Sequence, residues 1–368
     1  MAPYPGYAGV MNNSVLLLSR YVRRGPSSRV RHYNFLPALE QAGFHVTVAP
    51  FLDDEYLDRF YRGDRRSPQL LMKAYWRRLR QISTARRYDL IWIEKEALPW
   101  LPAVVERAFF GERPIVIDFD DPWHLRYAGH WSVVVRVVLG RKLETMAAHA
   151  KVVTAGSPAL AEWAKSSKAP CVIEIPPAVD IARYPVLPLP GGPFTIGWIG
   201  TPRNEAYLEL IAEPLRRIHA THGARVRLIG GSGRLSLPGV VIDNVPWREE
   251  TEAEELARCH VGVMPLLDGP WERGKCGYKL IQYMACGLPV VASPVGVNAQ
   301  IVRDGVSGFL ARENSEWITA LETLLTQPEL RAQMGAIGRR RAVEEYSLAS
   351  QEPRVRALIQ SVLAAAKG

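Results

Sequence analysis

The chain has 368 residues, which is too long for one ordinary hydrophobic core and fits two domains of roughly 150–200 residues each. Its composition is 48% hydrophobic and 23% charged, with no low-complexity tract and no repeat at solenoid periods, so a globular protein is expected. The formal net charge is +9, and no apolar run approaches the ~18–20 residues that a membrane-spanning helix needs.

Two features concern the compartment. Residues 1–14 lack a basic region followed by an apolar stretch, so no secretory signal is predicted. The spacings of the four cysteines fit neither a disulfide framework nor a zinc site. We therefore expect a cytoplasmic protein.

The first half of the chain alternates short apolar runs with segments of helical length. The predicted strands are 15–22, 45–51, 89–94, 114–119, 151–155 and 171–175. A turn at 23–28 and a helix that ends at Gln41, before Gly43, separate the first two strands. Buried β-branched runs between helices predict a parallel sheet that is covered on both faces.

A linker and a second alternating region follow. Residues 176–193 are rich in proline and glycine and cannot continue a helix or a central strand. Strands are then predicted at 194–199, 224–229, 240–243, 260–264 and 289–293, and helices at 206–219, 252–259 and 278–285. We therefore predict an α/β protein in which two doubly wound, Rossmann-like domains face each other across a cleft. The predicted units are 1–186, 187–350 and a C-terminal helix, 351–368, that could pack back on the first domain.

The basic charge is concentrated in one segment. Residues 62–87 contain nine lysines and arginines against the single acid Asp64, with Tyr75, Trp76 and Leu79 among them. This pattern is typical either of a solvated helix face or of a surface that binds anionic lipid headgroups or other phosphates. Nucleic acid is disfavoured as a partner, because no recognisable nucleic-acid module accompanies the charge.

A second basic segment, 23–31 (RRGPSSRVR), follows the first predicted strand. The residues that could contact anionic parts of a substrate are Gly25, Ser27, Ser28, Arg29 and Arg31. Alternatively, Ser27 or Ser28 caps the next helix, and both hypotheses can hold at once.

Acidic residues and a histidine gather in 118–124 (DFDDPWH), at the carboxyl end of the fourth predicted strand. Asp120 and Asp121 could orient an acceptor hydroxyl or act as a base, and His124 could touch a transferred group. A metal site and a simple turn cap are the alternative interpretations of these aspartates. Residues 94–96 (EKE), after the third strand, are a weaker candidate for the rim of the same cleft.

The stretch 271–296 predicts a glycine-containing loop, a short helix and a buried strand. Gly277 allows close approach of a ligand to the backbone, and a phosphate fits at the start of the helix. If that helix begins by Lys275, then Lys275 and Lys279 share a face and, with Arg273, could neutralise a diphosphate. The alternative is an ordinary β-loop-α-β unit with surface lysines.

Six fragments of the second half stand in a fixed order: GWIGTP (197–202), RLIGG (227–231), VPW (245–247), KLIQYMACGLPVVAS (279–293), PVG (294–296) and DGVSGFL (304–310). Together they resemble the C-terminal domain of retaining GT-B glycosyltransferases of the GT4 family (glycosyltransferase group 1), over about half of the chain. The resemblance implies a site for a nucleoside-diphosphate sugar. The residues it places there are Gly200, Thr201, Arg203, Val245, Trp247, Glu272, Arg273, Lys275, Gly277, Lys279 and Gln282.

Within that site the resemblance implies separate roles. The loop at 201–204 faces the diphosphate, the segment 245–247 borders the nucleobase, and Lys279 with Lys275 holds the diphosphate. Gln282 lies where the family usually has a glutamate that accepts hydrogen bonds from the ribose.

One departure from the family concerns that glutamate. The family has two glutamates separated by seven residues, and those positions are Gly274 and Gln282 here. Glu272 is two residues off register and could substitute through a longer loop, and a glutamine can still accept a hydrogen bond from a ribose diol. The missing first glutamate leaves the sugar and the base of the donor open.

The resemblance also implies a mechanism. Transfer retains the anomeric configuration, positive side chains stabilise the leaving diphosphate, and neither a metal nor another cofactor is expected. The expected catalytic residues are Asp120, Asp121, His124 and Lys279. The expected partners are the nucleotide-sugar donor and a glycan or lipid-linked acceptor, with the segment 62–87 on the inner face of an anionic membrane.

Two other functions fit the same architecture. A nucleotide-sugar epimerase or a glycogen-phosphorylase-like enzyme would share the fold, although no pyridoxal-phosphate lysine motif is evident; product analysis separates epimerisation from transfer. A non-catalytic protein that binds nucleotide or polyanion through a degenerate site would show no turnover, and its binding would fall steeply with salt.

Overall fold

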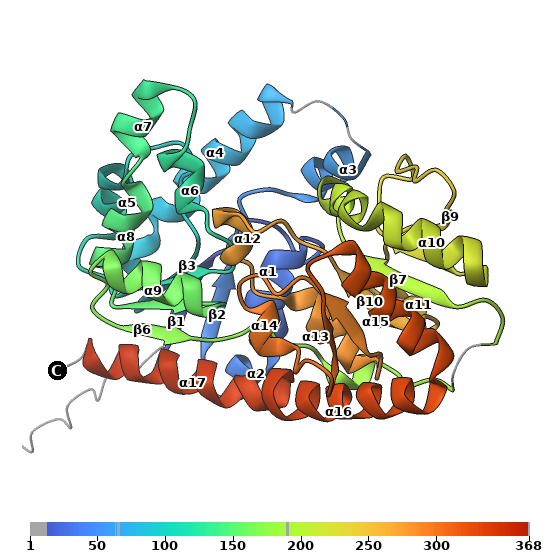
Figure 1. Cartoon of the computed structure of the whole chain (residues 1–368). Helices are drawn as coiled ribbons and strands as arrows, with labels where there is room; N and C mark the ends of the chain where they lie inside the picture. Colours follow the sequence, from blue (N-terminus) through green and yellow to red (C-terminus); the bar gives the residue numbers. More distant parts are fainter. Residues whose placement is uncertain (1–12, 63, 65–66, 189–190, 367–368) are drawn as a thin grey trace, which may run out of the picture.

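Two six-stranded parallel sheets with flanking helices organise the chain (Figure 1). The computed structural model describes residues 13–62, 64, 67–188 and 191–366. The strand order is β2-β1-β3-β4-β5-β6 in the first sheet and β12-β11-β10-β7-β8-β9 in the second. All neighbouring strands are parallel. The predicted fold class, an α/β protein with two doubly wound domains, is therefore confirmed.

The strands of the first sheet are β1 (Ser14–Leu18), β2 (His45–Val48), β3 (Leu90–Glu94), β4 (Ile115–Phe119), β5 (Val152–Ala155) and β6 (Val172–Glu174). Those of the second sheet are β7 (Thr195–Ile199), β8 (Arg225–Ile229), β9 (Val241–Val245), β10 (Val261–Met264), β11 (Val290–Ala292) and β12 (Gly308–Leu310).

The helices of the first half are α1 (Pro26–Arg31), α2 (Leu36–Gln41), α3 (Asp54–Arg62), α4 (Pro68–Ser83), α5 (Ala103–Phe110), α6 (His124–Ala128), α7 (Val133–Leu139), α8 (Lys142–His149) and α9 (Pro158–Ser166). Those of the second half are α10 (Ala212–His222), α11 (Glu252–Ala257), α12 (Pro270–Arg273), α13 (Tyr278–Ala285), α14 (Asn298–Ile301), α15 (Asn314–Thr326), α16 (Pro328–Tyr346) and α17 (Leu348–Ala365). Short 3₁₀ helices are η1 (Tyr33–Phe35), η2 (Ala85–Arg87), η3 (Ile181–Arg183) and η4 (Pro202–Ile211).

Strand β1 shows why its sequence is a continuous apolar run. Val15 and Leu17 pack in one core with α2 and α17, whereas Leu16 and Leu18 pack in another with α5 and α8. Because successive side chains point to opposite faces, a strand that is covered on both faces needs apolar residues at every position.

Two predicted helices are wrong in extent, in both cases near a proline. The helix that ends at Gln41 is divided into α1, η1 and α2: His32 leaves the helical region, with φ −133°, and Pro37 stands in the first turn of α2. The helix predicted at 206–219 is the 3₁₀ helix η4 followed by α10, with Pro214 in the first turn of α10. A proline lacks the N–H for the helical hydrogen bond and clashes with the preceding turn.

One predicted strand is too long, and one strand of the structure, β12, was not predicted. The first strand ends at Leu18 and not at residue 22, because the Ser19 hydroxyl donates to the carbonyl of Tyr21 at 3.0 Å and the chain turns there. Strand β12 is only three residues long and carries no alternating pattern that sequence reasoning could detect.

The last two helices cross from the second domain to the first (Figure 1). Helix α16 packs against the core of the second sheet through Ala342 and Tyr346, and α17 packs against the first sheet through residues such as Leu358 and Ile359. Between them Leu348 N donates to Val179 O at 2.9 Å, so the returning chain lies beside the outgoing linker. The two connections between the domains therefore run together.

The basic segment 62–87 does not form one basic face. Arg78 on α4 is buried and donates to two main-chain oxygens at 2.9 and 2.6 Å, and the guanidinium of Arg77 is paired with the Asp53 carboxylate at 2.9 Å. These two arginines hold the domain together, so the predicted surface role is wrong for them. Lys73 and Arg80 are exposed on the same helix.

Some predictions cannot be compared with the structure. Arg65 and Arg66 of the basic segment, and residues 1–12 of the region tested for a secretory signal, lie outside the described residues. In the part of the chain that is described, every helix is too short or too polar to cross a membrane.

Candidate functional site

A cleft of about 1290 Å³ lies between the carboxyl ends of the two sheets. Most of the residues predicted for substrate binding line it, from both domains. They are Gly25, Ser27, Arg29, Arg31, Asp120, Asp121, Gly200, Thr201, Arg203, Trp247, Glu272, Lys275, Gly277, Lys279 and Gln282. The topology of the two sheets thus brings together segments that are up to about two thirds of the chain apart.

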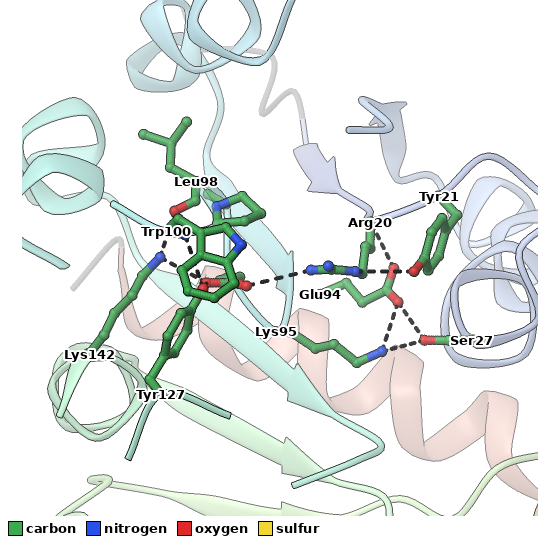
Figure 2. A network of polar contacts seen from close by, with 12 residues as sticks. Arg20, Tyr21, Ser27, Glu94, Lys95, Leu98, Trp100, Tyr127 and Lys142 are labelled. Carbon is green, nitrogen blue, oxygen red and sulfur yellow. Dashed lines mark hydrogen bonds and ion pairs between the residues drawn. The ribbon is translucent and has the colours of Figure 1, made fainter. Parts of the chain in front are cut away.

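Lys95 lies at the floor of the cleft, just after β3. Its backbone has a left-handed φ of 64°, which is uncommon outside glycine. Its Nζ donates to the Ser27 hydroxyl at 2.6 Å and forms an ion pair with Asp120 at 2.7 Å. Figure 2 shows Lys95 and Ser27 converging on Glu94, whose carboxylate is 3.4 Å from Lys95 Nζ. Lys95 therefore ties α1 to the ends of β3 and β4.

Glu94 fixes the start of α1. Its two carboxylate oxygens accept hydrogen bonds from the hydroxyls of Ser27 and Ser28, each at 2.5 Å, and one accepts from Arg20 N at 2.8 Å. The N-cap of α1 is Gly25, so the hypothesis that Ser27 or Ser28 caps the helix is wrong. Ser28 is buried against Glu94 and does not line the cleft.

The adjacent carboxyl groups of Asp120 and Asp121 have pKa values that move in opposite directions. Burial disfavours ionised Asp120, but the nearby Lys95 outweighs burial and lowers the pKa of Asp120 to about 2. Burial and the charge of Asp120 raise the pKa of Asp121 to about 6, against the opposing effect of Lys275. The floor of the cleft therefore combines a permanently ionised carboxylate with one that titrates near neutrality, as in acid–base sites.

We expect Asp121 to make the protein less stable as the pH rises from about 4 to 6. The pKa of Asp121 is about 6 in the folded protein, against an ordinary value of 3.8, so the folded state binds the extra proton in this interval. One such group gives a slope of up to about 1.4 kcal/mol per pH unit. Thermal unfolding from pH 4 to 7 should show the slope in the natural protein and in the surface variant Glu162→Gln, but not in Asp121→Asn. An unchanged slope in Asp121→Asn would contradict this assignment.

Arg31 is committed to a buried ion pair. Its Nε and Nη2 donate to the two carboxylate oxygens of Asp118 at 3.0 and 2.6 Å, and its Nη1 donates to Ile175 O at 2.6 Å. The Thr154 hydroxyl donates to the same carboxylate at 2.5 Å. Arg31 touches the cleft, but its guanidinium already has partners on all three nitrogens.

Arg29 reaches from α1 to the second domain. Its guanidinium nitrogens lie 3.6 Å from Glu252 and 3.8 Å from Glu249, and its Cζ lies 4.8 Å from the centre of the Trp247 ring. The Trp247 indole N–H in turn donates to Glu252 at 2.5 Å. Although the side chain is buried, Arg29 Nη1 has no hydrogen-bond partner among the described residues. The two domains therefore meet at Arg29.

The opposite wall of the cleft carries Lys279. Its Nζ lies 4.0 Å from the centre of the Trp198 ring, and a Cβ added to Gly200 would lie 2.9 Å from it. Gly200 thus leaves room for the ammonium group beside the loop that follows β7. Burial and repulsion by Lys275 lower the pKa of Lys279 well below its ordinary value of 10.5.

The expectation that Lys275 and Lys279 share a helix face is wrong. Helix α13 begins at Tyr278, and Gly277 before it has a left-handed φ of 68°. Lys275 therefore lies in the loop, where its Nζ is 5.6 Å from the centre of the Tyr207 ring. The turn at Gly277 still brings both lysines to the cleft.

Two tyrosines that sequence reasoning missed support the polar residues of this wall. The Gln282 amide donates to the Tyr184 hydroxyl at 2.9 Å, which leaves its oxygen as an acceptor. The Tyr207 hydroxyl donates to Glu272. Neither tyrosine stands in a motif, and each is more than sixty residues from its partner in the sequence, so no local signal could identify it.

Comparisons with known proteins agree with this arrangement. Residues 193–327 match the family Glycosyl transferases group 1. A D-inositol 3-phosphate glycosyltransferase of Mycobacterium marinum is 32% identical over 160 residues, which cover 40% of this chain and 34% of that protein. The segment 193–327 is therefore a GT4 sequence. The whole chain spans less than half the length of the curated relatives it matches.

Solved structures agree over nearly the whole chain. Anabaena HepE in complex with UDP-glucose has a TM-score of 0.71 at 18% identity and is covered to 99%, with 95% of this chain. Sucrose-phosphate synthase from Thermosynechococcus elongatus has a TM-score of 0.73 at 16% identity and is covered to 99%, with 96% of this chain. The GT-B fold is therefore shown.

The packing of the two domains explains the departure from the GT4 pattern at Gly274. A Cβ added there would lie 2.8 Å from Pro122 of the N-terminal domain, and Gly274 O accepts a hydrogen bond from the Ser157 hydroxyl at 3.1 Å. A glutamate at this position would push the two domains apart. Glu272, two residues earlier, lines the cleft in its place.

Three residues predicted for this GT4 site do not reach the cleft. The His124 ring stacks on Trp163, with ring centres 4.3 Å apart, and burial lowers the pKa of His124 to about 4. Arg273 is exposed and forms an ion pair with Asp268 at 2.6 Å. Val245 ends β9 and lies behind the cleft wall. The predicted contacts of His124 with the sugar and of Arg273 with the diphosphate are therefore wrong.

The aspartates of the cleft floor lie next to cations. Asp120 has Lys95 as its partner, and Asp121 lies within the electrostatic reach of Lys275. Among the residues that the structure describes, no three His, Cys, Asp or Glu side chains are arranged to hold a metal ion. The donor set around these aspartates therefore does not fit the metal-site interpretation.

Proposed function

We propose that the protein is a retaining glycosyltransferase that moves a sugar from a nucleoside-diphosphate sugar to a hydroxyl acceptor. The observation that carries this proposal is the charge of the cleft. Lys275 and Lys279 line one wall without an ion pair to any described residue, and Asp120 and Asp121 line the floor opposite. A diphosphate fits the lysines, and a sugar hydroxyl fits the carboxylates.

The lysines carry the main catalytic task in this proposal. Negative charge develops on the departing diphosphate, and partly buried cations that already face it stabilise that charge without reorganisation. Arg203, in the first turn of η4 after β7, lines the same part of the cleft and adds to this positive field. The acceptor hydroxyl attacks from the side of the leaving group and gives its proton to the departing phosphate.

The carboxylates position the acceptor. Asp120 is held by Lys95 and stays ionised, so it accepts a hydrogen bond from a hydroxyl at every physiological pH. Asp121 titrates near neutrality and points into the same space, next to Lys275. Contact of the two domains around Arg29 and Gly274 limits the access of water to the sugar.

For the donor we propose a site within the second domain. The loop at Gly200 and Thr201 would receive the diphosphate, the segment at Trp247 would border the base, and the Gln282 oxygen would accept from the ribose. UDP is the first nucleotide to test, because a solved structure of similar fold, HepE, contains UDP-glucose. No metal is assigned a role in this proposal.

For the acceptor we propose a glycan or a lipid-linked saccharide, and for the location the cytoplasmic face of a membrane. The four cysteines are free, as expected of a protein in a reducing compartment. Apolar side chains that line the cleft, among them Leu57, Phe60 and Trp271, fit an acceptor with an apolar part.

Thermal unfolding with UDP, GDP, ADP, TDP and CDP, each at about millimolar concentration, tests the donor site. A ligand at ~100 times its dissociation constant stabilises by roughly 2.7 kcal/mol, which shifts the melting temperature by several degrees in a protein of this size. We expect one nucleotide to give this shift, and NMR of the products to show an α- or β-linkage that matches the donor's anomer. No shift with any of the five, or binding that vanishes in moderate salt, would favour the polyanion-binding alternative. A product that is only an epimerised nucleotide sugar would favour the epimerase.

A further inference from the structure

Helix α7 presents an apolar face that nothing in the described chain covers. Its sequence is VVVRVVL, and Val134 and Val137 are 70% and 79% exposed, with Val133 and Val138 also exposed. Only Val135 and Leu139 face the core. Trp131, just before the helix, is 87% exposed. Valine is a poor helix former, so these valines serve neither helix stability nor the core.

Exposed apolar side chains also lie on α4, which the loop at Trp100 links to the residues before α7. Trp131 contacts His130, and His130 contacts Trp100, with ring centres 5.3 and 5.5 Å apart. The loop that carries Trp100 also accepts a hydrogen bond from the α4 residue Tyr75, at Pro99 O. On α4 itself, Met72 and Trp76 are 70% and 60% exposed. Figure 1 shows α4, α5, α6 and α7 gathered on one side of the N-terminal domain. We call Met72, Trp76, Trp100, Trp131, Val133, Val134, Val137 and Val138 the valine–tryptophan surface.

A buried polar network holds this surface in place. Lys142 Nζ binds Glu96 at 2.9 Å and Glu106 at 2.7 Å, and the Tyr127 hydroxyl donates to Glu96 at 2.8 Å. Figure 2 shows Lys142 and Tyr127 beside Trp100. The same Tyr127 hydroxyl accepts a hydrogen bond from Trp100 N at 3.0 Å. Trp100 keeps a left-handed φ of 63° under this constraint. The main chain at Trp100 is therefore held by the network, and the Trp100 side chain is 38% exposed beside it.

The charge on the segments that carry the valine–tryptophan surface is predominantly positive. Residues 65–88 and 122–143, which carry α4 and α6–α7, contain no aspartate or glutamate. Exposed cations among them are Lys73, Arg80, Arg136 and Arg141, of which Arg141 pairs with Glu144 at 3.0 Å. The Arg80 guanidinium lies 4.1 Å from the centre of the Trp76 ring, so a cation and an apolar side chain protrude together. Apolar side chains among predominantly basic residues complement an anionic bilayer better than a protein surface of mixed charge.

We propose that the valine–tryptophan surface docks the N-terminal domain on an anionic lipid bilayer, with the valines of α7 and Trp131 inserted among the headgroups. This proposal rests on the proposed function and adds to it the lipid bilayer that carries the acceptor. Arg126 lines the cleft and lies 4.9 Å from the centre of the Trp100 ring and 4.7 Å from that of Trp123. The cleft therefore opens next to the docking surface, and a lipid-linked acceptor reaches Asp120 without leaving the membrane.

Vesicle sedimentation tests the docking. The probes are vesicles of phosphatidylcholine alone and of phosphatidylcholine with about one third phosphatidylglycerol. We expect the natural protein to bind the anionic vesicles at least ~10-fold more tightly than the neutral ones, and less in high salt. Val134→Glu/Val137→Glu should lower binding to the anionic vesicles by about 10-fold or more. Lys73→Glu/Arg80→Glu should remove most of the preference for anionic lipid. The matched control is Val343→Glu, at an exposed valine on α16 of the other domain.

Control measurements distinguish this proposal from the alternative explanations. The thermal shift with nucleotide should be the same in Val134→Glu/Val137→Glu as in the natural protein, which shows that the variant is folded and its donor site intact. Equal vesicle binding by this variant and the natural protein would overturn the proposal. The proposal would also be overturned if the natural protein bound neither kind of vesicle and formed a dimer that Val134→Glu/Val137→Glu converted to a monomer. In that case α7 would bind a second copy of the chain. Vesicle binding without transfer by any nucleotide sugar would overturn the proposed function and leave the docking surface standing.

Discussion

Replacing Lys279 with alanine is expected to lower kcat/KM for the nucleotide-sugar donor by about 10²–10³-fold, the usual cost of removing one preorganised stabiliser of developing charge. Lys279 is partly buried beside Gly200, and its Nζ lies over the face of Trp198, with no carboxylate paired to it among the described residues. A cation that stays without a carboxylate in such a place is held for an anion that arrives with the substrate.

A calorimetric titration of Lys279→Ala with two ligands that differ in charge, UDP and uridine, tests whether Lys279 contacts the diphosphate. The variant should lose affinity for UDP and keep its affinity for uridine, because only the diphosphate meets Lys279. Arg273→Ala is the matched control, since Arg273 belongs to the same segment but is exposed and paired with Asp268 outside the cleft. Equal losses for UDP and uridine, or an equal effect of Arg273→Ala, would contradict the assignment of Lys279.

The number of protons taken up when UDP binds is an independent measure of the contact between Lys279 and the diphosphate. Burial and Lys275 lower the pKa of Lys279 in the free protein, whereas a bound diphosphate raises it again. Between the lowered pKa and 10.5, binding therefore takes up protons, and the affinity for UDP falls as the pH rises through this interval. Calorimetry in buffers of different ionisation enthalpy should detect the uptake in the natural protein and a smaller uptake in Lys279→Ala.

Both sheets could be predicted from the sequence for a physical reason. Strands that are buried on both faces give continuous apolar runs, so both sheets were predictable from residues such as Val15–Leu18 and Val290–Val291. The donor wall follows short local motifs, and α13 was predicted with its observed bounds, Tyr278–Ala285. The predicted bounds of two helices were wrong where prolines break the helix, at Pro37 and Pro214.

The N-terminal part of the site was harder to predict, because the roles of its residues depend on partners far away in the sequence. Arg29 and Arg31 are two residues apart and look alike, yet one meets the other domain and one pairs with Asp118. His124 follows two cleft residues but stacks on Trp163, about forty positions away. Lys95 was only a weak candidate in the sequence, and its ion pair with Asp120 depends on the order of β3 and β4 in the sheet. No local pattern contains this information.

Replacing Arg31 with methionine is expected to destabilise the N-terminal domain by about 3–5 kcal/mol, because it leaves the Asp118 carboxylate buried without its cation. Both side chains are almost inaccessible to water, and the Thr154 hydroxyl alone cannot neutralise the charge. For a domain of this size the melting temperature should fall on the order of 10 °C. Thermal unfolding and urea titration measure the change.

The double variant Arg31→Met/Asp118→Leu separates the pair from simple packing. Replacing both partners by apolar side chains removes the unpaired charge, so most of the lost stability should return. The exposed pair of Arg141 and Glu144 supplies the control: Arg141→Met should change the free energy of unfolding by no more than about 0.5 kcal/mol. If Arg31→Met keeps its stability but loses transfer activity, Arg31 contacts the substrate, as the basic segment 23–31 first suggested, and the structural role argued from its three occupied nitrogens fails.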